Sequence, residues 1–209
     1  MISHRLARLC APVLGVALAL VGCSGHGEAV PYKDTNANGV IGLCSKAGTP
    51  INHGKVNDSP FVWRSVSSSA AKPPYDAYRR TATLYAYVPK PGYPPQDWLG
   101  EQISAAAYYS NPAHPMVQAT SGDGAALLDF VQGSPPRWNG LIELRIYLGV
   151  PGESIYNATY PATDIQVKGD TWTVVRGGDV ACDSGSAVSS LVGTPPPPSP
   201  APTTTATSR

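Results

Sequence analysis

Charged side chains are scarce in this chain of 209 residues, of which only 14% are Asp, Glu, Lys or Arg. The 15 basic and 14 acidic residues nearly cancel, and no basic cluster marks a surface that would attract nucleic acid. We therefore expect no nucleic-acid partner. We also expect that any attachment to a membrane depends on a lipid, because basic residues are too few to hold anionic headgroups.

Motifs of common active sites and metal sites are missing as well. The histidines lack the spacing of zinc ligands, and there is no nucleophile elbow, no phosphate-binding glycine-rich loop and no Ser-x-x-Lys motif. No residue is therefore named as catalytic, no cofactor is expected, and the sequence favours a protein without enzymatic activity.

Long hydrophobic runs are absent too, since none reaches the ~20 residues of a membrane-spanning helix. The apolar run Leu9–Gly22 follows Arg5 and Arg8, which is typical of a signal peptide. It leads into Leu20-Val21-Gly22-Cys23, which resembles the lipobox of bacterial lipoproteins. The resemblance implies cleavage before Cys23 and attachment of diacylglycerol to the Cys23 thiol, with palmitate among the acyl chains. An ordinary secretory signal is the alternative.

The make-up of the chain also resembles that of envelope lipoproteins of high-GC Gram-positive bacteria. This resemblance implies a position on the outer face of the cytoplasmic membrane, with the membrane as a partner through the lipid on Cys23. We expect a binding or structural module of the cell envelope, with a cell-wall glycan or an envelope protein as further candidate partners. An envelope hydrolase with a dispersed active site is the alternative.

Only four cysteines are present. Cys10 leaves with the signal peptide and the Cys23 thiol takes the lipid, so only Cys44 and Cys182 keep an unmodified thiol in the mature chain. Outside the cytoplasm such a pair predicts a disulfide, worth about 4–5 kcal/mol in the chain-entropy model. Two free thiols are the alternative.

Composition divides the chain into four parts. Residues 1–22 are the signal peptide, and 23–43 hold the lipidated cysteine and a polar tether. Residues 44–192 form the globular domain, and 193–209 are a Pro- and Thr-rich tail that cannot bury a core.

Short alternating segments dominate the domain. Residues 81–88 and 141–148 alternate as strands, and in the second Ile142, Leu144 and Ile146 share one face with Glu143 and Arg145 opposite. A further strand is predicted at 154–160, a hairpin at 165–174 and a short helix at 121–132. These patterns predict a mainly β protein with a single antiparallel β-sandwich-like domain and one short helix. A β-rich α+β domain is the alternative.

Two groups of residues are candidates for binding. Asp34, Asn36 and Asn38 resemble the first half of a calcium loop, but the second half lacks the bidentate Glu, so a plain Asx turn is the preferred interpretation. The loop residues Trp98, His114 and Trp138 form the hypothetical ligand platform if their loops converge.

Overall fold

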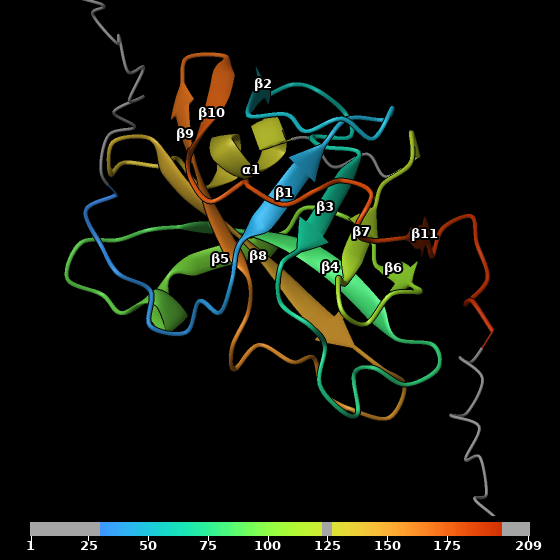
Figure 1. Cartoon of the computed structure of the whole chain (residues 1–209). Helices are drawn as coiled ribbons and strands as arrows, with labels where there is room; N and C mark the ends of the chain where they lie inside the picture. The colour runs from blue at the N-terminus through green and yellow to red at the C-terminus, as the bar shows by residue number, and fades with distance from the viewer. Residues whose placement is uncertain (1–29, 123–126, 198–209) are drawn as a thin grey trace, which may run out of the picture.

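The computed structural model describes residues 30–122 and 127–197 (Figure 1). Cys23 and the last part of the tail lie outside these residues. The described elements, in chain order, are β1 (Ile41–Cys44), β2 (His53–Lys55), β3 (Arg64–Ser67), β4 (Thr81–Val88), the 3-10 helix η1 (Pro95–Asp97), β5 (Leu99–Gln102), β6 (Ala107–Tyr109), β7 (Met116–Gln118), α1 (Leu127–Gly133), β8 (Leu141–Gly149), β9 (Ala162–Lys168), β10 (Thr171–Arg176) and β11 (Ala187–Ser189).

These strands form two antiparallel sheets. The smaller sheet has the order β1-β3-β7, and the larger has the order β11-β6-β4-β8-β9-β10-β2, with β5 paired to β4. Between them lies the main core, to which β1, β4, β8 and β9 contribute buried aliphatic side chains. The predicted mainly β, sandwich-like fold with one short α-helix is therefore confirmed.

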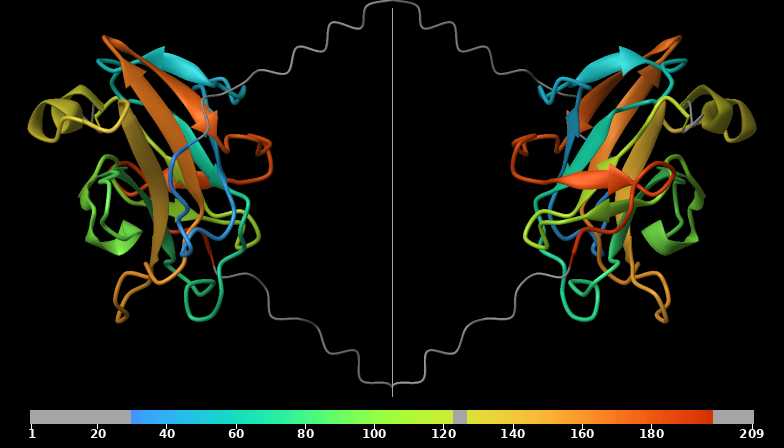
Figure 2. Two further views of the ribbon diagram at one scale, coloured as in Figure 1. Left: turned by 90° about the vertical axis from the view of Figure 1, so that its left-hand side faces the viewer. Right: turned by 90° about the vertical axis from the view of Figure 1, so that its right-hand side faces the viewer.

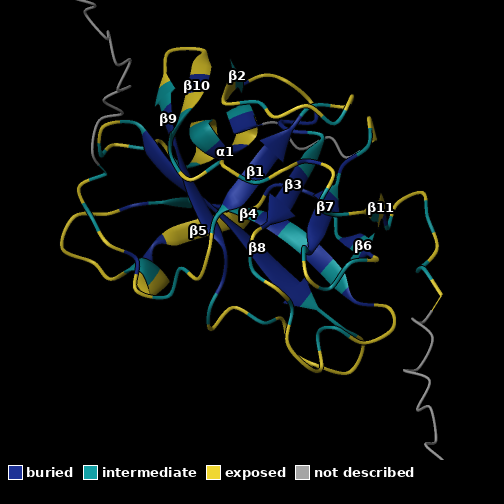
Figure 3. Ribbon diagram, in the orientation of Figure 1, coloured by how far each residue is buried: buried dark blue, intermediate teal, exposed yellow. Residues whose placement is uncertain are grey.

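Strand β8 lies at the centre of the larger sheet, between β4 and β9. One of its faces carries Ile142, Leu144 and Ile146 into the main core. Glu143 and Arg145 on its other face are also buried, at 0% and 1% exposure. Both faces of β8 are covered, which Figure 3 shows as an unbroken dark-blue strand.

Coil segments cover this second face. The chain from Tyr32 to Asn38, the η1 segment and the loop before β9 lie over it, and Asn38 N–H donates to the carbonyl of Tyr160 at 2.6 Å. The predicted strand at 154–160 is wrong, because this stretch makes only isolated bridges. Pro161 carries no N–H, and the next strand begins at Ala162.

Two predicted boundaries also change. The domain begins before residue 44, because all four residues of β1 are buried and Asp34 is only 7% exposed. The described part of helix α1 ends at Gly133 rather than at residue 132, Ser121 and Gly122 form a turn, and residues 123–126 of the predicted span lie outside the described part. The hairpin at 165–174 is confirmed, with β9 and β10 joined through Gly169.

The Cys44–Cys182 disulfide predicted from the cysteine inventory is present, with the two Cα atoms 5.9 Å apart. It ties β1 to the segment before β11, where both cysteines pack against Val66 and Met116. Within the described residues, no helix has the length and apolar character needed to cross a membrane.

Candidate functional site

Two regions of the larger sheet gather chemistry-bearing side chains. The first, here called the charge cluster, consists of Asp34, Glu143, Arg145, Asp164 and Arg176. The second, here called the apolar groove, lies where the β4–β5 connection faces the segment between α1 and β8. Their geometry decides which of the two is available to a ligand.

Arg145 is the centre of the charge cluster. Its Nε lies 2.7 Å from Glu143 Oε1, and its Nη2 lies 3.7 Å from Asp34 Oδ2. Nη2 also donates to the carbonyl of Pro95 at 3.0 Å, and Nη1 donates to the hydroxyl of Tyr147 at 3.3 Å. Each guanidinium nitrogen therefore has a partner inside the protein.

Arg176 completes the cluster from β10. Its Nη2 lies 3.3 Å from Glu143 Oε2, and its Nε pairs with Asp164. The hydroxyl of Tyr32 donates to the other oxygen of Asp164. Tyr32 is thus held by the cluster although it lies at the start of the described chain.

Aromatic rings surround the Arg145 guanidinium. Its Cζ lies 3.8 Å from the ring centroid of Tyr87, 4.5 Å from that of Tyr160 and 5.4 Å from that of Trp98. Such contacts stabilise a desolvated cation by roughly 1–2 kcal/mol each. The rings also keep water away from the Arg145 guanidinium. Contacts within the protein therefore replace the hydration that this cation loses on burial.

Three buried carboxylates face two guanidiniums, of which Arg145 is buried and Arg176 is 38% exposed, so the cluster has an excess of negative charge. Burial raises the pKa of Glu143 to about 8, while the neighbouring Arg145 opposes the shift. Burial likewise raises the pKa of Asp164, opposed by Arg176. The cluster therefore keeps a proton that isolated carboxyl groups would have lost well below neutral pH.

A small cavity of about 250 Å³ reaches the cluster between the Tyr87, Tyr147 and Tyr160 rings. The hydroxyl of Tyr147 donates to that of Tyr87 at 3.0 Å, and the hydroxyl of Tyr160 donates to Asp34 at 2.8 Å. Since these groups bind one another, the cluster acts as a structural support for the segments above it.

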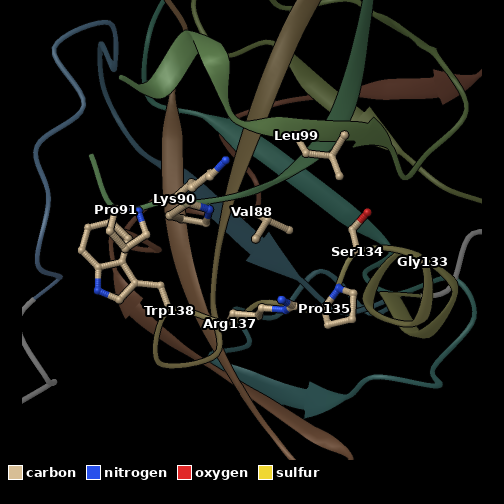
Figure 4. A pocket seen from close by; sticks show the side chains of 10 residues that line it. Val88, Lys90, Pro91, Leu99, Gly133, Ser134, Pro135, Arg137 and Trp138 are labelled. Atoms are coloured by element: carbon tan, nitrogen blue, oxygen red, sulfur yellow. The ribbon is translucent and has the colours of Figure 1, made fainter. Parts of the chain in front are cut away.

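The apolar groove has a different character. It encloses about 490 Å³ and is open to solvent (Figure 4). Its lining comes from two stretches, Val88, Pro89, Lys90, Pro91 and Leu99 on one side and Gly133, Ser134, Pro135, Arg137 and Trp138 on the other. In both views of Figure 2, η1 and α1, which flank these stretches, project from the same side of the molecule.

A tight turn positions Trp138 at the edge of this groove. Asn139 and Gly140 have φ values of 52° and 71°, and the amide of Leu141 donates to the carbonyl of Trp138 at 2.9 Å. Positive φ at both central residues is the mark of a type I′ turn, for which Asn-Gly is a preferred pair. A Cβ at position 140 would lie 2.2 Å from the carbonyl oxygen of Val167, so only glycine fits.

The structure brings together two of the three residues of the predicted platform. The Tyr32 ring contacts Trp98 at 4.8 Å and Trp138 at 5.5 Å between centroids. Trp98 is buried, its indole N–H donates to the carbonyl of Tyr93 at 3.0 Å, and it does not line the groove itself. His114 does not join them: it lies before β7, where its Nδ1 is 3.1 Å from the carbonyl of Ser67.

The Asp34 loop has partners within the protein. Asp34 Oδ1 accepts from the amide of Asn36 at 2.8 Å, which is an Asx turn, and Oδ2 accepts from Tyr160. Across residues 30–122 and 127–197, no three His, Cys, Asp or Glu side chains are placed to hold a metal ion.

Sequence reasoning missed the charge cluster and Tyr32. The signal was the charged pair Glu143 and Arg145 on one face of the strongest predicted strand. It does not reveal the covering segments, because these are coil without periodicity. Lys90, Leu99 and Arg137 of the groove lie in loops or on the edge strand and carried no signal of their own.

Comparison of the chain with protein-family models, with curated proteins and with solved structures returns no match.

Proposed function

We propose that this chain is a lipid-anchored, non-enzymatic binding module on the outer face of the cytoplasmic membrane. The observation that carries the binding function is the open apolar groove, because large apolar pockets with few polar groups are the usual binding sites of proteins. The anchor and the location rest on the resemblance of residues 20–23 to a lipobox.

The Cys44–Cys182 disulfide supports the location. Disulfides persist in oxidising compartments outside the cytoplasm and are rare inside it. This bridge closes a loop with a sequence separation of 138 residues, so it fixes both ends of the domain to each other. A domain held in this way keeps the groove in shape beyond the membrane surface.

Metabolic labelling with palmitate tests the anchor. We expect label on the full chain and its loss in Cys23→Ser, whereas the matched control Cys10→Ser keeps the label because Cys10 leaves with the signal peptide. Intact-mass measurement under non-reducing conditions should show an acylated chain that begins at Cys23 and has no free thiol. An unlabelled, released chain would reject the anchor.

A screen of ligand classes tests the binding function. Purified chain is titrated with cell-wall glycans, peptides and lipids while tryptophan emission is recorded, and Trp138→Ala serves as the binding-defective variant. Binding that depends on Trp138 supports the proposal. Ligands that bind equally well to the Trp138→Ala chain would place the site elsewhere.

A deep pocket with His114 near a carboxylate, such as Asp123 or Asp129, would favour an envelope hydrolase, and Asp123 lies outside the described residues. The ring nitrogen Nδ1 of His114 lies beside the backbone carbonyl of Ser67, and Asp129 is exposed on α1. Since no observation favours this activity, we do not propose it.

A further inference from the structure

We propose that the apolar groove docks the domain onto an anionic phospholipid of the membrane that anchors it, with an acyl chain in the groove and the phosphate beside Lys90 and Arg137. This inference rests on the proposed function, which places the domain at that membrane. It adds the ligand class and the orientation of the domain.

The groove offers apolar surface that the domain itself does not use. Val88 and Leu99 are direct cross-strand partners, so their side chains lie on the same face of the sheet. Leu99 is nevertheless 64% exposed, and all of β5 is exposed, which Figure 3 shows in yellow. Trp138 and Pro91 close one end of the groove in Figure 4. A partner with a hydrocarbon chain fits this lining.

Charge complementarity selects an anionic partner. Lys90 and Arg137 are both exposed, and neither forms an ion pair with another described residue. None of the ten lining residues is acidic. The Lys90 ammonium group lies 3.7 Å from the ring centroid of Tyr93, which is itself half exposed, so this contact defines its position without an ion pair. A phosphate group is the natural ligand of such a pair.

The tether places the groove next to the lipid. Tyr32 contacts Trp138 at the groove edge, and eight residues, or nine steps from Cα to Cα, connect it to Cys23. A chain of that length spans at most ~32 Å, so the groove stays within reach of the leaflet that holds the lipid. In Figure 1 the first described residues and the 134–140 loop lie on the same side, and the C-terminal end leaves on the other.

Vesicle binding of a chain without lipid tests the proposal. Residues 23–209 with Cys23→Ser keep every described residue and cannot be acylated. We expect this chain to co-sediment with phosphatidylglycerol vesicles about 25-fold more strongly than with phosphatidylcholine vesicles, since each of the two cations near an anionic leaflet contributes about a five-fold factor. Brominated acyl chains should quench its tryptophan emission, and Trp138→Phe should remove that quenching.

Matched variants localise the contact. Lys90→Gln with Arg137→Gln should lower the affinity for phosphatidylglycerol vesicles by about 25-fold, whereas the control pair Lys46→Gln and Lys72→Gln, which lies outside the groove, should not. Leu99→Ser should also weaken binding. The control for that substitution is Ile155→Ser, because Ile155 is similarly exposed, at 54%, but does not line the groove.

Three results would overturn the proposal. The first is equal binding to both vesicle types with no effect of the groove variants. The second is a change in Trp138 emission, without lipid, when residues 198–209 are removed, which would identify the tail as the occupant. The third is a dimer in sedimentation that Leu99→Ser dissociates. None of these results depends on whether Cys23 incorporates palmitate, so the docking proposal and the lipid anchor are tested independently.

Discussion

Arg145 and Arg137 belong to neighbouring stretches of the same chain and have opposite surroundings. The guanidinium of Arg145 is buried, with protein partners on each nitrogen and aromatic rings around it. Arg137 lies exposed on the rim of an open groove without an ion pair among the described residues. An arginine side chain therefore stabilises the fold at position 145, whereas at position 137 it is available to a ligand.

The comparison shows how the two regions depend on each other. The charge cluster holds Tyr32 through Asp164, and it holds the η1 segment through the contact of Arg145 with the carbonyl of Pro95. The Tyr32 ring then contacts both Trp98 and Trp138, and so links the cluster to the edge of the groove. The charge cluster, whose polar groups are paired within the protein, thus helps to position the residues at the edge of the apolar groove.

Removing the central cation should give the largest effect. Arg145→Met takes from buried Asp34 its cation and from buried Glu143 the nearer of its two cations, so we expect the free energy of unfolding to fall by about 3–5 kcal/mol. Urea denaturation followed by circular dichroism measures this loss. The matched control Arg137→Met should cost less than about 0.5 kcal/mol. Equal losses in the two variants would contradict the distinction between the regions.

The pH dependence of stability should come from the charge cluster. The pKa of Glu143 is about 8 in the folded protein against 4.5 for the ordinary group, because burial disfavours its charge. As the pH rises, Glu143 loses its proton in the unfolded chain at a lower pH than in the folded protein. The free energy of unfolding is therefore highest below pH 4.5 and falls as the pH rises to about 8. At about 1.4 kcal/mol per pKa unit, the loss is on the order of 5 kcal/mol at most.

Glu143→Gln tests this dependence of the free energy of unfolding on pH. The amide cannot ionise, so the variant should gain stability relative to the wild type as the pH rises from 5 to 9. The measurement is the urea midpoint at each pH, and Glu101→Gln on the exposed edge strand β5 is the control. A difference between variant and wild type that stays constant with pH would reject the raised pKa.

Sequence reasoning predicted the parts of this fold that carry periodicity. The alternating residues of β4 and β8 and the hairpin of β9 and β10 were found with nearly correct bounds. The disulfide followed from counting cysteines. The strand predicted at 154–160, after the Pro-Gly turn, is wrong because this segment lies over the sheet as coil and buries Tyr160 against Arg145.

The candidate site was predicted only in part, for a physical reason. Trp98 and Trp138 lie in different loops and meet only through Tyr32, a contact between segments far apart in the chain. Such a contact depends on how the coil segments pack on the sheet, and the local sequence pattern does not predict this packing. His114 looked equivalent in the sequence because it also follows a stiff turn, but its loop lies elsewhere.

A smaller effect is expected where the two regions meet. Tyr32→Phe removes the hydroxyl that donates to Asp164 but keeps the ring against Trp98 and Trp138. We expect a loss of about 1–2 kcal/mol, since a buried charged acceptor loses one donor. Thermal or urea unfolding measures it, with Tyr93→Phe, an exposed tyrosine, as the control. An unchanged stability would mean that the cluster does not hold the N-terminal segment.

The smallest change in stability should come from the groove itself. Leu99 is 64% exposed on an edge strand, so Leu99→Ser removes little buried apolar area and should alter the free energy of unfolding by less than about 0.5 kcal/mol. Leu144→Ala, in the main core on β8, should cost about 2–5 kcal/mol. Since Leu99→Ser is also expected to weaken vesicle binding, the two measurements together separate binding from folding. A large loss of stability in Leu99→Ser would show that the groove is part of the core, and the contrast with the charge cluster would no longer hold.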